Sequence, residues 1–248
     1  MNEAAQDRTV LRITGSDRES FLQGLITNDI KGLNDGLVYA ALLTPQGKYI
    51  ADFFLVPSED AILLDAFSSQ ATMLVQRLSM YKLRANVQIE ETDIAVQRGL
   101  GDAPEGTFPD PRHPALGWRG YGTNAEYDST IDWDAVRVAH TIPESGIELH
   151  PDSFILECGF ERLHGVDFRK GCYVGQEVTA RMKHKTELRK GLVAVLLQGP
   201  VTPGTEITSG GKAAGVIHTV SGGQAIAYLR LDRAGPDMEA DGVKIALA

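Results

Sequence analysis

From Gly191 to the C-terminus, the sequence alternates short apolar stretches with glycine-rich turns, and this pattern restricts the fold of that region more than any other feature. Glycine pairs at 210–211 and 222–223 stand between the stretches. Short strands at regular spacing, with turns between them, are typical of a small barrel or sandwich. We therefore predict a C-terminal β-barrel domain over residues 186–248. Its expected strands are Leu192–Leu197, Gly215–Val220, Gln224–Leu231 and Val243–Leu247.

Residues 1–185 carry a different pattern, in which apolar residues recur at both helix and strand spacing. Ser16 and Glu19 have the spacing of a capping box, which predicts a helix start there. Residues 44–47 contain proline and glycine and predict a hairpin turn between two apolar strands. Strands interleaved with helices favour an α+β domain. Strands are expected at 8–14, 37–43, 48–56, 61–65, 86–90 and 93–97, and helices after residue 16, over 71–81 and over 131–140.

Residues 101–125 are rich in glycine and proline and predict a long irregular connection. We place an approximate break there, so that the predicted domain 1–185 comprises two subdomains. A second irregular stretch is expected at 143–159.

The charge and hydropathy of the chain exclude several functional classes. With a formal net charge of −9, a broad phosphate-neutralising surface is not expected, and neither is direct nucleic-acid binding. Apolar runs stay shorter than the ~18–20 residues of a membrane-spanning helix, so no membrane association is expected. Residues 1–8 have neither a basic start nor an apolar stretch, which argues against a signal peptide. These features predict a cytoplasmic location.

The chain has 2 cysteines, Cys158 and Cys172, and they are not paired in a CxxC motif. A self-contained iron–sulfur cluster typically needs four cysteine ligands. Any cluster that this protein contacts would therefore be shared with a partner. Cys158 lies in the stretch 156–160 (LECGF), which offers no charged helper for a thiolate, and this favours a structural role.

Cys172 stands just before a stretch with helical spacing, because Val174, Val178 and Met182 recur every four residues. A helix beginning near 173–175 would place the thiol at a helix N-terminus, where the partial positive charge favours a thiolate. Lys170 and Arg181 could add to this effect. The alternative is that Cys172 is a small buried hydrophobic residue, and the pattern alone does not decide between the two.

The octapeptide from Lys170 to Glu177 (KGCYVGQE) resembles the signature of the YgfZ family at every fixed position. Three further stretches are similar to the same family: residues 21–29 (FLQGLITND), 43–48 (LTPQGK) and 81–84 (YKLR). Thr179-Ala180-Arg181 and the basic run that follows are closest to the mitochondrial Iba-type assembly factors. The basic run consists of Arg181, Lys183, His184, Lys185, Arg189 and Lys190.

This resemblance implies the fold of the glycine-cleavage T-protein, a ring of subdomains around a central folate-sized hole, with a C-terminal barrel. It implies support of [4Fe–4S] enzymes, including radical-SAM enzymes that modify tRNA or make lipoate. Cys172 would be the working thiolate, or the ligand of a cluster shared with an A-type scaffold protein. Asp52 would serve as a base or folate contact. The implied cofactor-binding residues are Lys170, Gly171, Tyr173, Gly175, Gln176, Glu177, Arg181 and Arg84.

Two departures from the T-protein pattern bear on tetrahydrofolate. Where many relatives carry a pterin-binding glutamate, this sequence has Ala139, which cannot accept the paired hydrogen bonds. An Asp-Asp pair after the hairpin becomes Ala51-Asp52, so one carboxylate is lost. Both departures weaken the expectation of folate binding and count against aminomethyl transfer.

Three hypotheses remain open from the sequence. The leading one is an assembly factor that is not a classical enzyme, in which Cys172 shares a cluster with an A-type scaffold. The second is a tetrahydrofolate-dependent, aminomethyltransferase-like transferase. The third is a degenerate folate-fold binding module with only a partner-docking role. Under any of the three, the basic run Arg181–Lys190 could hold a polyglutamate tail, a phosphate or an acidic partner surface, or could be a solvated helix face.

Overall fold

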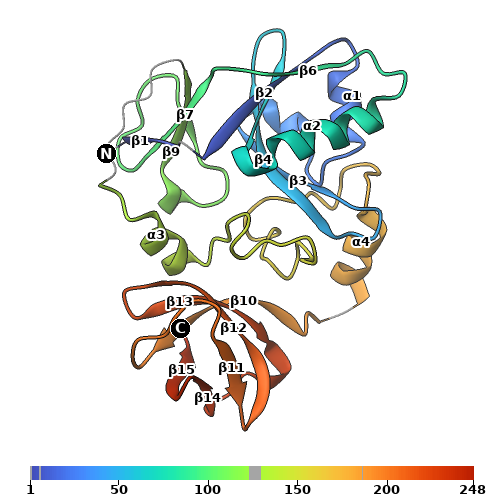
Figure 1. Ribbon diagram of the computed structural model, residues 1–248. Helices are drawn as coiled ribbons and strands as arrows, with labels where there is room; N and C mark the ends of the chain where they lie inside the picture. The colour runs from blue at the N-terminus through green and yellow to red at the C-terminus, as the bar shows by residue number, and fades with distance from the viewer. Residues whose placement is uncertain (1, 6, 123–129, 186) are drawn as a thin grey trace. The chain divides into compact units, whose positions relative to one another are not determined.

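The computed structural model of the chain describes residues 2–5, 7–122, 130–185 and 187–248 (Figure 1). The chain divides into two compact units. The first comprises residues 1–131 and 161–176, and the second comprises residues 132–160 and 177–248. Within the described residues, no helix is both long enough and apolar enough to span a membrane.

The first unit is built on an antiparallel sheet of five strands in the order β3-β4-β5-β2-β6. Residues that alternate along these strands point to one face and form an apolar core, which the helices α1 and α2 complete through side chains such as Leu22 and Leu74. The hairpin turn closes where Thr44 N donates to the Lys48 carbonyl at 2.8 Å. The bounds are β2 Arg8–Thr14, β3 Val38–Leu43, β4 Tyr49–Pro57, β5 Ile62–Phe67, β6 Gln88–Glu91, α1 Arg18–Gln23 and α2 Ser68–Lys82.

A second antiparallel sheet in this unit has the order β1-β7-β9-β8. Its centre is the pairing of β7 with β9, with Gln97 opposite Gly120. The bounds are β1 Asn2–Ala4, β7 Ala95–Gly99, β8 Phe108–Pro109 and β9 Trp118–Gly122, with short 3-10 helices at Ile30–Asn34 and Pro114–Leu116.

The face of the five-stranded sheet opposite the helices carries a buried network of charges. Asp65 accepts from Arg8 Nε at 2.6 Å and from Arg119 Nη2 at 2.7 Å. Asp110 accepts from Arg112 Nε at 3.0 Å and Nη2 at 2.8 Å, and lies 3.6 Å from Arg119 Nη1. Three arginines and two aspartates thus link the strands of this face to the segment 110–119.

In the second unit, strands β10 to β15 form a closed barrel in the order β10-β13-β12-β11-β14-β15 (Figure 1, orange to red). Its interior is filled by small and branched apolar side chains such as Val195, Ile217 and Ala227. The bounds are β10 Lys190–Leu197, β11 Glu206–Ser209, β12 Lys212–Ser221, β13 Gln224–Arg230, β14 Met238–Ala240 and β15 Val243–Leu247, with a 3-10 helix at Leu231–Arg233.

The segment Asp132–Phe160 belongs to the same unit and contains α3, Trp133–His140. A buried ion pair lies within this segment, where Arg137 Nη2 donates to Glu148 at 2.5 Å, and Glu148 in turn contacts the barrel. The other oxygen of Glu148 accepts from the Thr219 hydroxyl on β12 at 2.5 Å. This contact explains why a segment that precedes the barrel in sequence groups with it in space.

The α+β class and the C-terminal barrel are confirmed, but local differences remain, among them β1, which was not expected. The capping box does not form: Asp17 precedes α1 without a side-chain cap, and its carboxylate accepts from Asn86 N at 2.8 Å instead. The connection 101–125 is not wholly irregular, because β8 and β9 lie in it. The barrel contains β11 and β14 in addition to the expected strands. The domain boundary after residue 185 and the break near 100–125 stay predictions.

Candidate functional site

The segment 161–176, which leads to Cys172, is held by the loop that follows α1. Thr27 Oγ1 donates to the Gly165 carbonyl at 2.7 Å, and Asn28 Nδ2 donates to the His164 carbonyl at 2.7 Å. Asp167 N donates back to the Thr27 carbonyl at 3.1 Å. The stretch 21–29 therefore serves as a cradle for the segment that precedes the cysteine.

Lys170 fixes the start of the loop that carries Cys172, which we call the thiol loop and define as residues 170–175. Its Nζ donates to the carbonyls of Gln23 at 2.8 Å, Ile26 at 2.6 Å and Asn28 at 2.9 Å. An ammonium has three N–H donors, so these three bonds use all of them. Burial lowers the pKa of Lys170 to about 8. Lys170 thus positions the loop rather than offering its charge to a ligand.

The other side of the thiol loop is fixed by packing. Tyr173 is buried, its ring 5.1 Å from the Lys170 ammonium, and Val174 packs against the apolar core of the sheet. Gly175 has φ +86°, and a Cβ there would lie 2.6 Å from the Thr44 carbonyl oxygen of the hairpin turn. Only glycine meets both the backbone conformation and this close approach.

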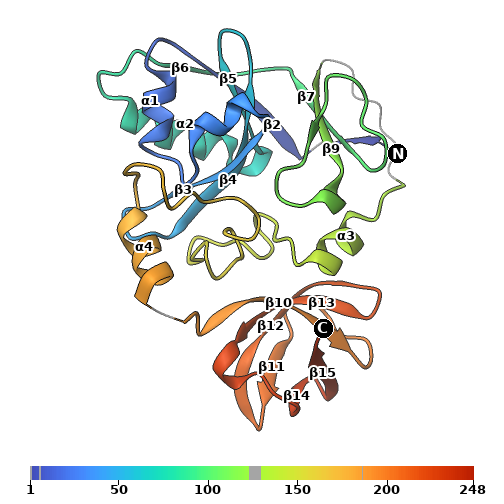
Figure 2. The ribbon, with the colours of Figure 1, turned by 180° about the vertical axis from the view of Figure 1, so that it is seen from behind.

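Cys172 stands between these two anchors, and its side chain is exposed. The thiol loop is part of the segment that leads into α4 in Figure 2. Helix α4 spans Gln176–Lys185, so the cysteine lies four residues before it. The helix was expected to begin near 173–175, and the effect of its N-terminus on the thiol stays a prediction. The geometry is that of an accessible thiol on a loop whose backbone is held on both sides.

The remaining predicted cofactor-binding residues are more dispersed. Gln176 Nε2 donates to the Gly171 carbonyl at a long 3.5 Å, which steadies the loop only weakly. Glu177 and Arg181 are exposed on α4, and Arg84 is exposed just after α2. Their roles stay predictions, as does that of the basic run, in which Lys183 and His184 are exposed and residue 186 lies outside the described residues.

Asp52 lies on β4, remote in sequence from the thiol loop, and is almost fully buried. Its oxygens accept from the hydroxyls of Tyr39 at 3.0 Å and Tyr49 at 2.6 Å. Burial, together with the charge of Asp52, raises the pKa of Tyr39 well above its usual value, which keeps that hydroxyl a donor. Ala139 is exposed on α3 and provides no side-chain acceptor. These residues do not fit a pterin in the manner of the T-protein pattern.

Metal chemistry is limited by the available ligands. The described residues contain no group of three or more His, Cys, Asp or Glu side chains that could hold a metal ion. Cys158 is 1% exposed, and burial raises its pKa to about 12. Cys172 is the thiol that remains accessible, so this chain has one exposed cysteine ligand to offer.

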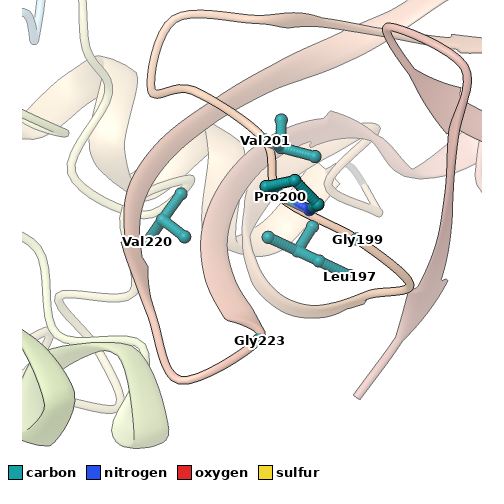
Figure 3. A pocket seen from close by; sticks show the side chains of 6 residues that line it. All are labelled: Leu197, Gly199, Pro200, Val201, Val220 and Gly223. Atoms are coloured by element: carbon teal, nitrogen blue, oxygen red, sulfur yellow. The ribbon is translucent and has the colours of Figure 1, made fainter.

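A pocket of about 370 Å³ opens at one end of the barrel (Figure 3). Its lining has no titratable side chain, which argues against a catalytic site there. In Figure 3, Leu197, Pro200 and Val201 gather on one side with Val220 facing them. The lining residues are Leu197, Gly199, Pro200, Val201, Val220 and Gly223.

The exposure of the two cysteines predicts selective alkylation. Iodoacetamide should label Cys172 rapidly in the native protein and leave Cys158 unlabelled, because a buried thiol with a raised pKa presents almost no thiolate. Peptide mapping by mass spectrometry measures both sites. In denaturant both should react, which serves as the control. Faster native labelling of Cys158 would contradict the exposures on which the site rests.

Comparisons with known proteins agree with this structure. Residues 189–248 match the family model of the CAF17 C-terminal β-barrel domain. The fold resembles the glycine cleavage system aminomethyltransferase T from Bartonella henselae, with a TM-score of 0.81, 13% identity, and coverage of 99% of this chain and 84% of that one. At that identity the likeness shows the fold alone. The protein thus has the fold of the aminomethyltransferase T class, ending in a CAF17-type barrel.

Curated relatives narrow this class. The chain is 34% identical to the mitochondrial iron–sulfur cluster assembly factor IBA57 homolog of Mycosarcoma maydis, over 79% of this chain and 57% of that protein. It is 32% identical to mouse IBA57, over 90% of this chain and 75% of that protein, and 28% identical to the human protein. The chain belongs to the IBA57 family of iron–sulfur cluster assembly factors.

One expectation is overturned by these relatives. The predicted cytoplasmic location is wrong, because the IBA57 relatives are named as mitochondrial proteins. The N-terminal residues, on which that prediction depended, were a poor guide. Support of tRNA-modifying enzymes has no counterpart in the relatives' names and stays a prediction.

Sequence reasoning missed several residues that shape the site. Thr27 and Asn28 were recognised only as part of a family stretch, and their side-chain contacts to residues 164 and 165 join positions 136 and 138 apart in sequence. Tyr39 and Tyr49, whose hydroxyls donate hydrogen bonds to the Asp52 carboxylate, were not singled out at all. Tyr39 alternates with the core residues Val38 and Ala40 on β3, and that alternation was the available signal for it. Tyr49 could not be placed in this way, because the pairing of β3 with β4 shifts register between Leu42 and Leu43, so Tyr49 and Asp52 do not follow a simple alternation.

Proposed function

We propose that the chain is an iron–sulfur cluster assembly factor supporting [4Fe–4S] enzymes, and that Cys172 gives one thiolate to a cluster shared with an A-type scaffold protein. The observation that carries the proposal is the exposed thiol of Cys172 on a loop anchored on both sides, in a chain of the IBA57 family. Ligation releases the thiol proton, because the thiolate is the form that binds metal. The cluster is cargo in this scheme.

Ligand number supports sharing. A [4Fe–4S] cluster needs about four ligands, whereas this chain offers one accessible cysteine, and Cys158 is buried. The scaffold would supply the remaining thiolates. Clients would then be [4Fe–4S] enzymes, with radical-SAM enzymes as the proposed subset from the family resemblance.

A tetrahydrofolate-dependent transferase is the second candidate, and the fold likeness to an aminomethyltransferase favours it. Two features of the site count against it. Both oxygens of Asp52 already accept from tyrosine hydroxyls, and Ala139 stands where the pterin-binding carboxylate is expected. The assembly role also uses the exposed thiol of Cys172, so it accounts for more of the site.

Cluster reconstitution tests the proposal. The chain alone, given iron, sulfide and reductant, should stay colourless, whereas the chain with an A-type scaffold should develop thiolate-to-iron absorption and migrate as a complex. Cys158→Ala is the matched control and should behave as the unmodified chain. A stoichiometric [4Fe–4S] cluster on the chain alone would sink the shared-ligand model. Tight tetrahydrofolate binding by calorimetry would favour the transferase instead.

A further inference from the structure

The turn that ends α2 holds a leucine in a conformation that leucine rarely adopts. Leu83 has φ 45° and ψ −103°, and Ala85 N donates to the Lys82 carbonyl across it at 2.7 Å. This is the position of a tight turn that glycine normally occupies, because a Cβ is disfavoured at positive φ. A leucine therefore stands at a position for which the fold itself would favour glycine.

The same leucine is the most exposed large apolar side chain among the described residues, at 89%. Met80, one turn earlier on α2, follows at 69%. Neither side chain contributes burial to this unit, so packing does not explain the choice of residue. The stability of the fold therefore does not explain a leucine at positive φ beside an exposed methionine.

Three cations flank these two side chains in the sequence. Arg77 and Arg84 are exposed and Lys82 is partly exposed. From Ala66 to Ile89 the sequence contains no aspartate or glutamate, in a chain with a net charge of −9. A cation at a helix C-terminus also interacts favourably with the helix dipole, but that interaction needs neither Leu83 nor Met80. We call Arg77, Met80, Lys82, Leu83 and Arg84 the α2-end patch.

We propose that the α2-end patch is a docking surface for an acidic protein, with Leu83 and Met80 entering an apolar pocket and Arg77, Lys82 and Arg84 facing carboxylates on its rim. The inference rests on the proposed function and deepens it, since the docked protein is the A-type scaffold that shares the cluster. An apolar centre with a charged rim is the usual anatomy of such an interface. The cations would also steer association with an acidic partner.

Two other occupants fit the patch less well. A nucleic acid would use the cations but has no pocket for two protruding apolar side chains. A membrane surface would contact both the cations and the apolar side chains. Interfacial anchoring depends on a broad apolar helix face, however, and here only Leu83 and Met80 are offered. Both occupants are outcomes of the test below.

Binding of the full chain to the purified A-type scaffold, measured by biolayer interferometry at low and high salt, tests this inference. Leu83→Gly should weaken binding by about tenfold or more, because it removes the apolar anchor. The same change should raise the melting temperature by about 2–4 °C, because the turn is relieved of strain. Arg84→Glu should slow association chiefly at low salt. Leu247→Ala, at an exposed leucine in the barrel, is the control and should bind as the unmodified chain.

The outcomes separate this inference from the proposed function. Cys172→Ala should bind the scaffold normally but form no shared cluster, and a cluster formed without Cys172 would overturn the proposed function alone. Unchanged scaffold binding by Leu83→Gly, with a raised melting temperature, would overturn the docking surface alone. Leu83-dependent binding to anionic vesicles or to duplex DNA, with scaffold binding unaffected, would also overturn it. No binding by the unmodified chain would overturn both.

Discussion

Replacing Cys172 with alanine is expected to abolish support of [4Fe–4S] enzymes and to leave the melting temperature close to that of the unmodified chain. The fold does not depend on the sulfur atom, because Cys172 is exposed and the thiol loop is fixed by Lys170, Val174 and Gly175. Ligation does depend on it, since alanine offers no donor atom to iron. Function and stability should therefore separate.

Two measurements check this separation. One is complementation of a strain lacking its own factor, with lipoate content or aconitase activity as the readout. The other is thermal melting of the purified variants. Cys158→Ala is the matched control: it should retain function and melt a few degrees lower, because removal of a buried sulfur leaves a small cavity. Full complementation by Cys172→Ala would contradict the role of the thiol and leave the assembly function to other surfaces.

Local periodicity was sufficient to predict much of the fold. The hairpin around residues 44–47, helix α2 and most of the barrel strands were expected from apolar spacing and turn residues, and they are present. These elements bury one face or alternate side chains, so burial imposes the spacing that the sequence displays. The short strands β11 and β14 were missed, because they are only four and three residues long.

Tertiary contacts explain the other differences. Ser16 and Glu19 have capping-box spacing, yet Asp17 lies at the helix start and its carboxylate is drawn to Asn86 N, 69 positions away in sequence. β9 was missed because glycines and prolines surround it, although it gains a full strand partner in β7. Local propensity contains no information about a hydrogen-bond partner that is distant in sequence.

For the candidate site too, the sequence located some features, and others depend on tertiary contacts. The family signature located Cys172, and the structure leaves that thiol accessible. The signature could not reveal that Lys170 uses its three donors on the carbonyls at the end of α1, or that Gly175 is required by the hairpin turn. Two residues of the family signature, Lys170 and Gly175, thus hold the loop that carries the exposed thiol.

The largest effect on stability is expected from Asp65→Asn. Asp65 is fully buried and its two oxygens accept from Arg8 at 2.6 Å, Arg119 at 2.7 Å and the Tyr121 hydroxyl at 3.0 Å. Removing its charge leaves Arg8 without its ionic partner and Arg119 with only Asp110, 3.6 Å away. Breaking a buried ion pair in this way typically costs about 3–5 kcal/mol of the free energy of unfolding.

A matched control involves β2, the strand that carries Arg8. Arg12, also on β2, pairs with Asp60 at 2.5 Å, but the Asp60 side chain is 73% exposed. Asp60→Asn should change the free energy of unfolding by less than about 1 kcal/mol, because solvent screens an exposed pair. Urea unfolding of the two variants gives both values. Equal losses from Asp65→Asn and Asp60→Asn would show that burial of the network contributes nothing.

The pH dependence of the Asp65→Asn effect follows from the same contacts. Burial alone would raise the pKa of Asp65, but the guanidinium groups of Arg8 and Arg119 outweigh it and hold the pKa below its usual value. A carboxyl whose pKa is lowered in the folded state contributes stability that is fully present above its unfolded pKa of about 3.9 and is lost as the pH falls through the folded value. The difference in unfolding free energy between the unmodified chain and Asp65→Asn should thus be constant from neutral pH to about pH 5 and shrink below about pH 4. A difference that grows in acid would show that the native structure holds Asp65 protonated, and the ion pairs with Arg8 and Arg119 would then not be the source of its stability.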